Sequence, residues 1–131
     1  MSRNTSAHIT SIAVFILYMG FLAYLCFGHP TAFFKVPRTL WGIPIDKVIH
    51  FAMFFPYPFF AQAAFFFKNR WRSLVFVIIT GIIFCYTFEL LQDKITTYRT
   101  SDPWDLSANI AAVTIGSTII AIVTLFRKSS R

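Results

Sequence analysis

The sequence predicts an all-α membrane protein in which four transmembrane helices form a compact bundle and a single domain over residues 1–131. Three observations lead to this prediction: 56% of the residues are apolar, only 13% are charged, and the apolar residues gather in long runs. Ordinary soluble domains are about 25% charged. A soluble fold of this size could not bury so many large side chains, which include 17 Phe residues. The lipid bilayer is therefore the expected surroundings of most of the chain.

Four apolar runs of 19 to 21 residues are each long enough to cross a membrane. They extend from Ile9 to Phe27, from Val48 to Phe67, from Leu74 to Gln92 and from Leu106 to Phe126. At about 1.5 Å per residue, about 20 helical residues cross a hydrocarbon core of roughly 30 Å. Within that core each backbone amide must find its partner inside the protein, so each run is expected to be a helix.

The first two runs need separate comment. The first follows Arg3 and could be a secretory signal, but it exceeds the usual signal core of about 7 to 15 apolar residues and no small-residue cleavage pattern follows. A transmembrane helix is the preferred interpretation. The second run contains Pro56 and Pro58, which lack a backbone N–H and crowd the preceding turn, so a bend is expected near the middle of the membrane.

The third and fourth runs are expected to be straighter helices. In the fourth, Ala108, Ala112 and Gly116 follow one another at four-residue intervals. Such a stripe of small residues allows another helix to approach closely, and it turns the neighbouring Asn109 inward.

The distribution of basic residues predicts the orientation. Seven Lys and Arg residues fall at the two ends of the chain and in the loop between the second and third runs, against five in the other two loops. The six-residue loop from Lys68 to Ser73 holds three of the seven, and short loops weigh most in the positive-inside rule. Both termini are therefore expected in the cytoplasm.

Two common function classes do not fit the pattern. The net charge of +7 does not indicate nucleic-acid binding, because the cations lie between apolar runs instead of forming one basic surface. Cys26 and Cys85 both lie inside apolar runs, so the sequence offers neither a disulfide framework nor a zinc site with paired cysteines.

The acidic residues are sorted more sharply than the basic ones. All five fall at or just beneath the predicted outer face: Asp46, Glu89, Asp93, Asp102 and Asp105. Acids are tolerated outside, which is enough to explain Asp93. Glu89 follows 15 residues of its apolar run, so it lies roughly 22 Å into a core of about 30 Å. An ionisable group at that depth is expected to face protein or water.

Helical spacing gathers the polar residues into three sets at the outer ends of the helices. Asp46 pairs with His50, Glu89 with Gln92, and Asp105 with Asn109, at intervals of three or four residues. Arg99 and Lys47 have side chains long enough to reach the same level. The sequence therefore predicts an outward-facing polar site.

Each member of the predicted site also has a structural interpretation. Asp102 before Pro103 is typical of a helix N-cap, and Asp46 suits the first turn of a helix. Histidine at an interface is often only hydrogen-bonded, Gln92 and Asn109 could hold helices together, and Arg99 could merely pair with a nearby acid. Convergence of all of them on one face favours a shared functional site.

The motif string resembles the VanZ-like family of small bacterial membrane proteins over about residues 10–126. Residues that match the family pattern are Asp46, Lys47, His50, Glu89, Gln92, Arg99, Asp105 and Asn109. Ala112 and the pair Thr97 and Tyr98 depart from it, at a usual glycine and a usual turn. The resemblance implies a multi-helix protein of the bacterial inner (cytoplasmic) membrane and a link to teicoplanin resistance, with no settled biochemical activity.

Two hypotheses of function follow. In the first, the chain is a membrane enzyme that acts on a lipid-linked or other cell-envelope ligand. The catalytic residues are then His50, Glu89, Asp105 and Asp46, and the ligand-binding residues are Arg99, Lys47, Gln92 and Asn109. Arg99 and Lys47 would hold an anionic head group. In the second, the protein is not an enzyme, and the polar network binds a ligand or only holds the helices together. Transport is weaker, because the middle thirds of the helices hold no ionisable group.

The lipid bilayer is the expected partner and nucleic acid is not. No metal and no cofactor is predicted, and the sequence does not indicate an oligomeric state.

Overall fold

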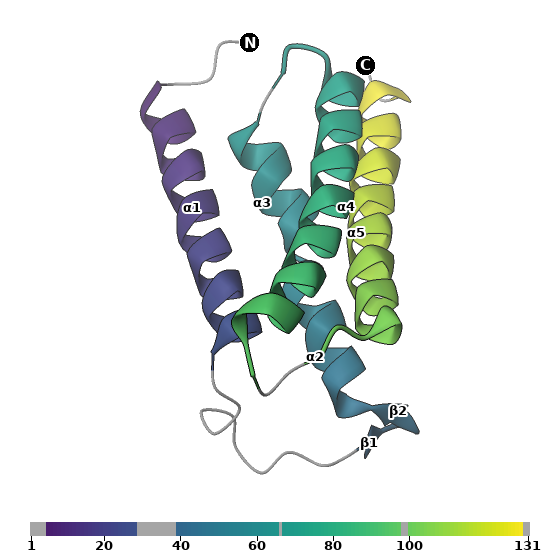
Figure 1. Cartoon of the computed structure of the whole chain (residues 1–131). Coiled ribbons are helices and arrows are strands. Elements are labelled where there is room, and N and C mark those ends of the chain that lie inside the picture. Colours follow the sequence, from purple (N-terminus) through teal and green to yellow (C-terminus); the bar gives the residue numbers. More distant parts are fainter. Residues whose placement is uncertain (1–4, 29–38, 66, 98–99, 130–131) are drawn as a thin grey trace.

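A computed structural model describes residues 5–28, 39–65, 67–97 and 100–129 of the chain. The elements are, in order, α1 (Thr5–Phe27), β1 (Thr39–Leu40), β2 (Ile43–Pro44), α2 (Ile45–Phe54), α3 (Tyr57–Ala64), α4 (Arg70–Ile95) and α5 (Pro103–Ser129). The described part of the chain is therefore mostly helical, which agrees with the all-α part of the predicted fold class (Figure 1).

The first, third and fourth apolar runs form the long helices α1, α4 and α5. All three are long and apolar enough to cross a membrane. Each extends beyond its apolar run, α1 at its start and α4 and α5 at both ends, because polar residues there continue the helix. Asn69, for example, caps α4 by accepting hydrogen bonds from the backbone N–H groups of Trp71 and Arg72. A count of apolar residues alone therefore underestimated the length of each helix.

The second run does not form the single bent helix that was expected over Val48–Phe67. It forms two short helices, α2 and α3, of 10 and 8 residues, and neither reaches across a bilayer core by itself. The interruption lies at Phe55 and Pro56, where the proline N–H is missing from the helical ladder. Tyr18 of α1 donates a hydrogen bond to the carbonyl of Met53 at this break (2.5 Å).

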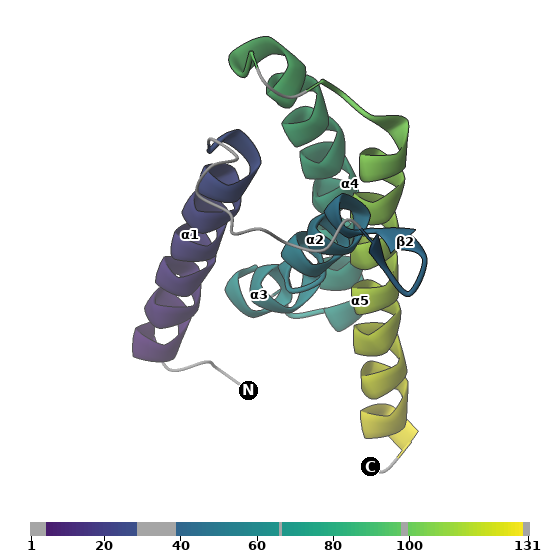
Figure 2. The ribbon, with the colours of Figure 1, turned by 90° about the horizontal axis from the view of Figure 1, so that it is seen from below.

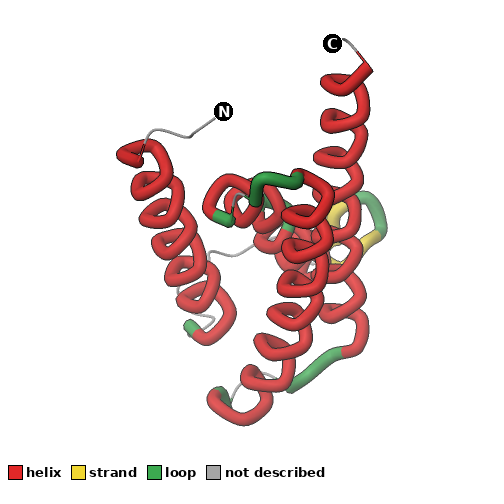
Figure 3. Tube along the Cα trace, turned by 90° about the horizontal axis from the view of Figure 1, so that it is seen from above, coloured by secondary structure: helices red, strands yellow, loops and turns green. Residues whose placement is uncertain are grey.

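Helix α5 provides the surface on which α2, α3 and α4 assemble, whereas α1 packs against α3 and α4. Helix α5 packs most extensively against α4 and α2, while α3 packs against α1, α4 and α5 (Figures 2 and 3). A Cβ added at Gly116 would lie 3.0 Å from Pro58 Cγ, so the small-residue stripe of α5 does allow close approach. Gly81 of α4 is as tightly packed, because its Cβ would lie 2.7 Å from Val113 Cγ1.

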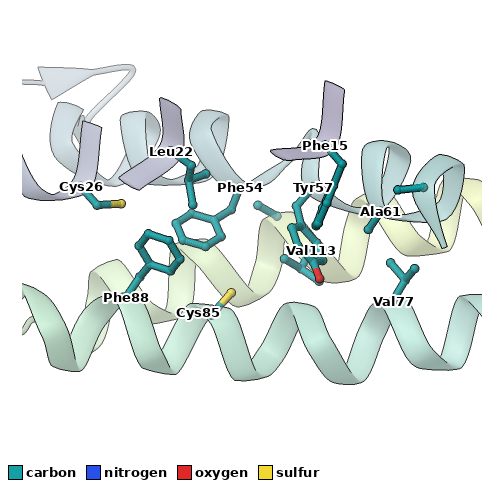
Figure 4. Packing of buried hydrophobic residues seen from close by; sticks show 12 residues of the cluster. Phe15, Leu22, Cys26, Phe54, Tyr57, Ala61, Val77, Cys85, Phe88 and Val113 are labelled. Atoms are coloured by element: carbon teal, nitrogen blue, oxygen red, sulfur yellow. The ribbon is translucent and has the colours of Figure 1, made fainter. Parts of the chain in front are cut away.

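The buried core lies where α1, α3, α4 and α5 face one another. Leu22, Phe54, Tyr57 and Val113 are almost fully buried, and the ring of Phe88 meets that of Phe54 edge-on (Figure 4). Outside this core the long helices expose many large apolar side chains, among them Leu17, Ile83 and Phe126. Such surfaces suit contact with lipid and not with water.

A short β-hairpin was not predicted. Strands β1 and β2 pair antiparallel, with Leu40 opposite Ile43, and Trp41 and Gly42 form the turn. Both turn residues have positive φ, at 51° and 79°, a backbone that usually calls for Asn, Asp or Gly. With Trp in the first position, the sequence lacked the usual hairpin signal.

The ends of the elements divide between the two ends of the bundle. The start of α1, the connection from α3 to α4 and the end of α5 lie at one end (Figure 1). The hairpin, the start of α2, the end of α4 and the start of α5 lie at the other. This arrangement matches the predicted order of loops, whereas the assignment of one end to the cytoplasm remains a prediction.

Candidate functional site

Three helix ends meet at the hairpin end of the bundle and bring the predicted polar residues together. The start of α2 supplies Asp46, Lys47 and His50, the last turns of α4 supply Glu89, and the start of α5 supplies Asp105 and Asn109. Residues separated by more than 40 positions thus contact one another directly. We call this group, together with Asp102, the polar cluster.

Lys47 lies at the centre of three carboxylates. Its Nζ is 2.5 Å from Asp102, 2.5 Å from Asp105 and 2.9 Å from Asp46. An ammonium group has three N–H donors, so these three contacts use all of its capacity. Because Asp102 and Asp105 belong to the start of α5, Lys47 ties that helix end to α2.

These contacts set the pKa values at the exposed rim of the cluster. The Lys47 ammonium, assisted by the backbone N–H of Trp104, lowers the pKa of Asp102. Burial acts to raise the pKa of Asp46, but its hydrogen bonds with Lys47 outweigh burial and the pKa is lowered. Burial likewise acts to lower the pKa of Lys47, and the hydrogen bonds to Asp102, Asp105 and Asp46 raise it instead. All three groups are therefore charged at neutral pH.

His50 forms the deeper part of the cluster and is only 4% exposed. Its Nδ1 lies 3.1 Å from Oδ1 of Asn109, and its Nε2 lies 3.6 Å from Oδ2 of Asp105. When Nδ1 carries the hydrogen and donates it to Asn109, a neutral imidazole turns the lone pair of Nε2 toward the carboxylate of Asp105. These two acceptors together form a place where a hydrogen-bond donor of a ligand can bind.

Glu89 is the most unusual member, because it is a carboxylate that is only 3% exposed in the last turns of a long apolar helix. Its Oε1 accepts a hydrogen bond from the backbone N–H of Asp102 (2.6 Å). Its Oε2 is buried and has no hydrogen-bond partner among the described residues. A buried carboxylate oxygen without a partner destabilises the fold, so this arrangement is not explained by stability.

One predicted member lies outside the polar cluster, and another lies outside the described residues. Gln92 is 2% exposed and donates a hydrogen bond from Nε2 to the backbone carbonyl of Cys26 (3.1 Å), so it links α4 to α1 as its structural interpretation expected. Arg99 lies outside the described residues.

Asp102 combines two roles, of which the sequence indicated one. Its Oδ1 accepts from the backbone N–H of Trp104, which makes it the N-cap predicted from the following Pro103. Its other oxygen binds Lys47, and its own N–H reaches Glu89. No spacing rule could have found these contacts, because they connect three different helices.

The carboxylates could in principle hold a cation. Oxygens of Asp46, Asp102 and Asp105 lie within 4.8 Å of one another, and a hard metal ion prefers such ligands. In this arrangement, however, the Lys47 ammonium bonds to each of them and provides the positive charge itself. A metal ion would first have to displace Lys47.

Comparison of the chain with protein-family models, curated proteins and solved structures finds no match. The polar cluster and the residues that carry the resemblance are therefore the evidence that bears on function.

Proposed function

We propose that the chain is a VanZ-like protein of the bacterial inner membrane that binds or acts on a lipid-linked cell-envelope ligand. Both termini are cytoplasmic in this proposal, and the polar cluster opens toward the outer leaflet. The link to teicoplanin resistance comes from the resemblance. The observation that carries the proposal of a site is the buried carboxylate of Glu89, whose Oε2 has no hydrogen-bond partner among the described residues.

Burial of the Glu89 carboxylate without a partner for Oε2 among the described residues destabilises the fold. Burying a polar group without a hydrogen bond costs about 1 to 3 kcal/mol in proteins, and a charge costs more. An apolar side chain at position 89 would avoid this cost, and an amide would avoid the additional cost of a charge. Ionisable groups within membrane helices are therefore functional candidates, and Glu89 lies one helix turn from Gln92, a residue with a purely structural contact.

The chemistry assigned to the site is proton exchange with a bound ligand. Asn109 holds the imidazole of His50 in place, and Asp105 faces its other nitrogen. A hydroxyl or ammonium group of the ligand that entered between Nε2 and Oδ2 would donate to either atom, and His50 would accept its proton as a general base. Glu89 would supply the second acceptor through Oε2.

The geometry changes the role expected for Lys47. Its three donors are used by Asp46, Asp102 and Asp105, so it does not hold an anionic head group in this arrangement. The ligand chemistry that fits the described part of the cluster is a group with hydrogen-bond donors, because carboxylates outnumber the fixed cation.

The second candidate function is the structural network. It is favoured by two specific observations: Lys47 is fully paired, and Gln92 bonds to the α1 backbone. These contacts hold helix ends together and need no ligand. The two candidates therefore divide the predicted residues, with Lys47, Asp46, Asp102 and Gln92 on the structural side and His50, Glu89 and Asp105 on the chemical side.

Single replacements separate the two candidates. His50→Ala, Asp105→Asn and Glu89→Gln are produced in a teicoplanin-susceptible host, and membrane abundance, melting temperature and the minimum inhibitory concentration of teicoplanin are measured. Ser117→Ala is the matched control, because Ser117 also has a buried, unpartnered side-chain oxygen but lies 12 residues along α5 from Asp105.

The proposal predicts that wild-type protein raises the inhibitory concentration and that the three site variants lose this effect at normal abundance. The control should keep it. If the wild-type protein leaves teicoplanin susceptibility unchanged, the resistance part of the proposal is wrong. If the site variants keep the effect, or lose it only through loss of the protein, the network is structural.

A further inference from the structure

We propose that the hairpin Thr39–Pro44 lies in the interface of the membrane, with Trp41 among the lipid head groups beside the polar cluster. The inference requires that the helix bundle is embedded in a bilayer. It does not depend on the chemistry proposed for His50 and Glu89.

The hairpin exposes apolar side chains that its own fold does not use. Trp41 is 92% exposed, and Leu40 and Ile43 on the two strands are exposed as well. A hairpin with two residues per strand has almost no stability of its own in water. Some other surface must therefore compensate for ordering it and for exposing these side chains.

The backbone of the turn does not favour tryptophan at position 41. Its φ of 51° lies in the left-handed region, where a bulky residue is strained by about 1 kcal/mol or more. Asn or Gly would form the same two-residue turn without strain. The indole is therefore retained at an unfavourable position, which points to a contact made by the side chain.

The position of the hairpin identifies that contact. Strand β2 ends at Pro44 and α2 begins at Ile45, so the hairpin is joined without a linker to the helix that carries Asp46 and Lys47. It lies at the same end of the bundle as the polar cluster and projects outward beside α5, on the opposite side from α1 (Figures 1 and 2). Seen along the bundle it extends past the helices, where a bilayer would surround them.

Other apolar side chains at the same end of the bundle are exposed as well (Figure 1). Trp104 in the first turn of α5 is 74% exposed, and Ile95 at the end of α4 is exposed too. From Trp104 onward, α5 keeps an exposed apolar face and is long enough to cross the membrane. Tryptophan is enriched at the boundary of the hydrocarbon core because its ring is apolar and its N–H is polar. Trp41 and Trp104 thus mark one membrane boundary.

This placement fixes the depth of the polar cluster. Lys47 and Asp46 follow the hairpin within a few residues, so they lie at head-group level, and His50 lies one helix turn deeper. A lipid-linked ligand would therefore present its polar head to the cluster while its chains remained beside α5.

Tryptophan fluorescence tests the placement directly. The full-length chain with Trp71→Phe and Trp104→Phe retains Trp41 alone and is reconstituted into phosphatidylcholine vesicles. Quenching is compared for lipids brominated near the glycerol backbone, lipids brominated near the chain ends, and aqueous iodide. A matched protein that retains only Trp104 serves as the reference for the interface.

The proposal predicts blue-shifted emission from Trp41, strong quenching by bromine near the glycerol backbone, and weak quenching by iodide. Emission typical of indole in water, with strong iodide quenching and no effect of the brominated lipids, would overturn it.

A second measurement does not need the double variant to fold. Hydrogen exchange of the hairpin amides is followed in phosphatidylcholine nanodiscs for the wild type and for Trp41→Asn. Asn fits the positive φ better, so exchange would be equal or slower if the hairpin were only a turn, and that result would overturn the proposal. Loss of an interfacial anchor instead predicts several-fold faster exchange in the variant.

Discussion

Replacement of Lys47 by Met should destabilise the protein strongly at neutral pH and much less in mild acid. Lys47 is the only described cation that contacts Asp46, Asp102 and Asp105, and Met keeps the length and apolar stem of its side chain. The variant therefore removes the ammonium group and little else. It leaves three carboxylates whose oxygens lie within 4.8 Å of one another without their shared partner.

The magnitude follows from the exposure of the three partners. Asp46 and Asp102 are 55% and 34% exposed, and ion pairs of this kind contribute about 0 to 1 kcal/mol each. Asp105 is 13% exposed, and removing one partner of a fully buried pair costs about 3 to 5 kcal/mol. The cluster lies between these limits, so we expect a loss of about 2 to 3 kcal/mol in the free energy of unfolding at pH 7.

The pH dependence has a definite sign. The pKa values of Asp46 and Asp102 are lowered in the folded protein, so their ion pairs contribute stability above their unfolded pKa of about 4 and lose it as the pH falls through the folded values. In Lys47→Met the crowded carboxylates gain stability when they bind protons. The difference between variant and wild type should therefore be largest near pH 7, shrink as the carboxylates of the variant bind protons, and shrink further below about pH 4 as the wild-type ion pairs are lost.

The assay is reversible unfolding in mixed micelles at several pH values, followed by circular dichroism. Lys94→Met is the control, because Lys94 is an exposed cation at the end of α4 that forms no ion pair with the described residues. It should change the free energy of unfolding by less than about 0.5 kcal/mol. A Lys47→Met protein as stable as the wild type, or a deficit independent of pH, would refute the reasoning.

Three further predictions concern packing and hydrogen bonds. Gly81→Ala should lower the melting temperature and destabilise the protein by about 1 to 3 kcal/mol, because its Cβ would lie 2.7 Å from Val113 Cγ1; an unchanged melting temperature would contradict the close packing. Gln92→Leu should lower the free energy of unfolding by about 1 kcal/mol, because it removes the donor to the Cys26 carbonyl, and it should leave any resistance phenotype intact. Loss of that phenotype at full abundance would place Gln92 in the site. Asn109→Leu should lower the free energy of unfolding by about 1 to 3 kcal/mol, because Nδ1 of the buried His50 imidazole loses its partner. NMR of His50 should show a changed tautomer population, and an unaltered spectrum would contradict the hydrogen bond.

The sequence was sufficient to predict the helices that depend on hydrophobic length. Helices α1, α4 and α5 each contain one apolar run, and the position of the break in the second run follows from Pro56. The sequence could not show that the run divides into two helices. That depends on how α2 and α3 each pack on α5, and such contacts are not local.

The polar cluster was predictable in its members but not in its pairing. Helical spacing placed His50, Asp105 and Asn109 at one level, and the structure brings them together. The central place of Lys47 could not be predicted, because a long side chain reaches several partners and only the crossing of α2 and α5 selects among them. The sequence-based role of Lys47 as a grip for an anionic head group therefore does not suit the observed pairing.

The central claim is that Glu89 is kept for its chemistry at a cost in stability, and Glu89→Gln tests it most directly. The amide has the same shape, keeps an acceptor for the Asp102 N–H and removes the ionisable group. Melting temperature in micelles and teicoplanin susceptibility in cells are measured on the same variant. The account predicts a melting temperature equal to or above that of the wild type together with loss of the resistance phenotype. A lower melting temperature with the phenotype retained would show that Glu89 serves the fold and not the site.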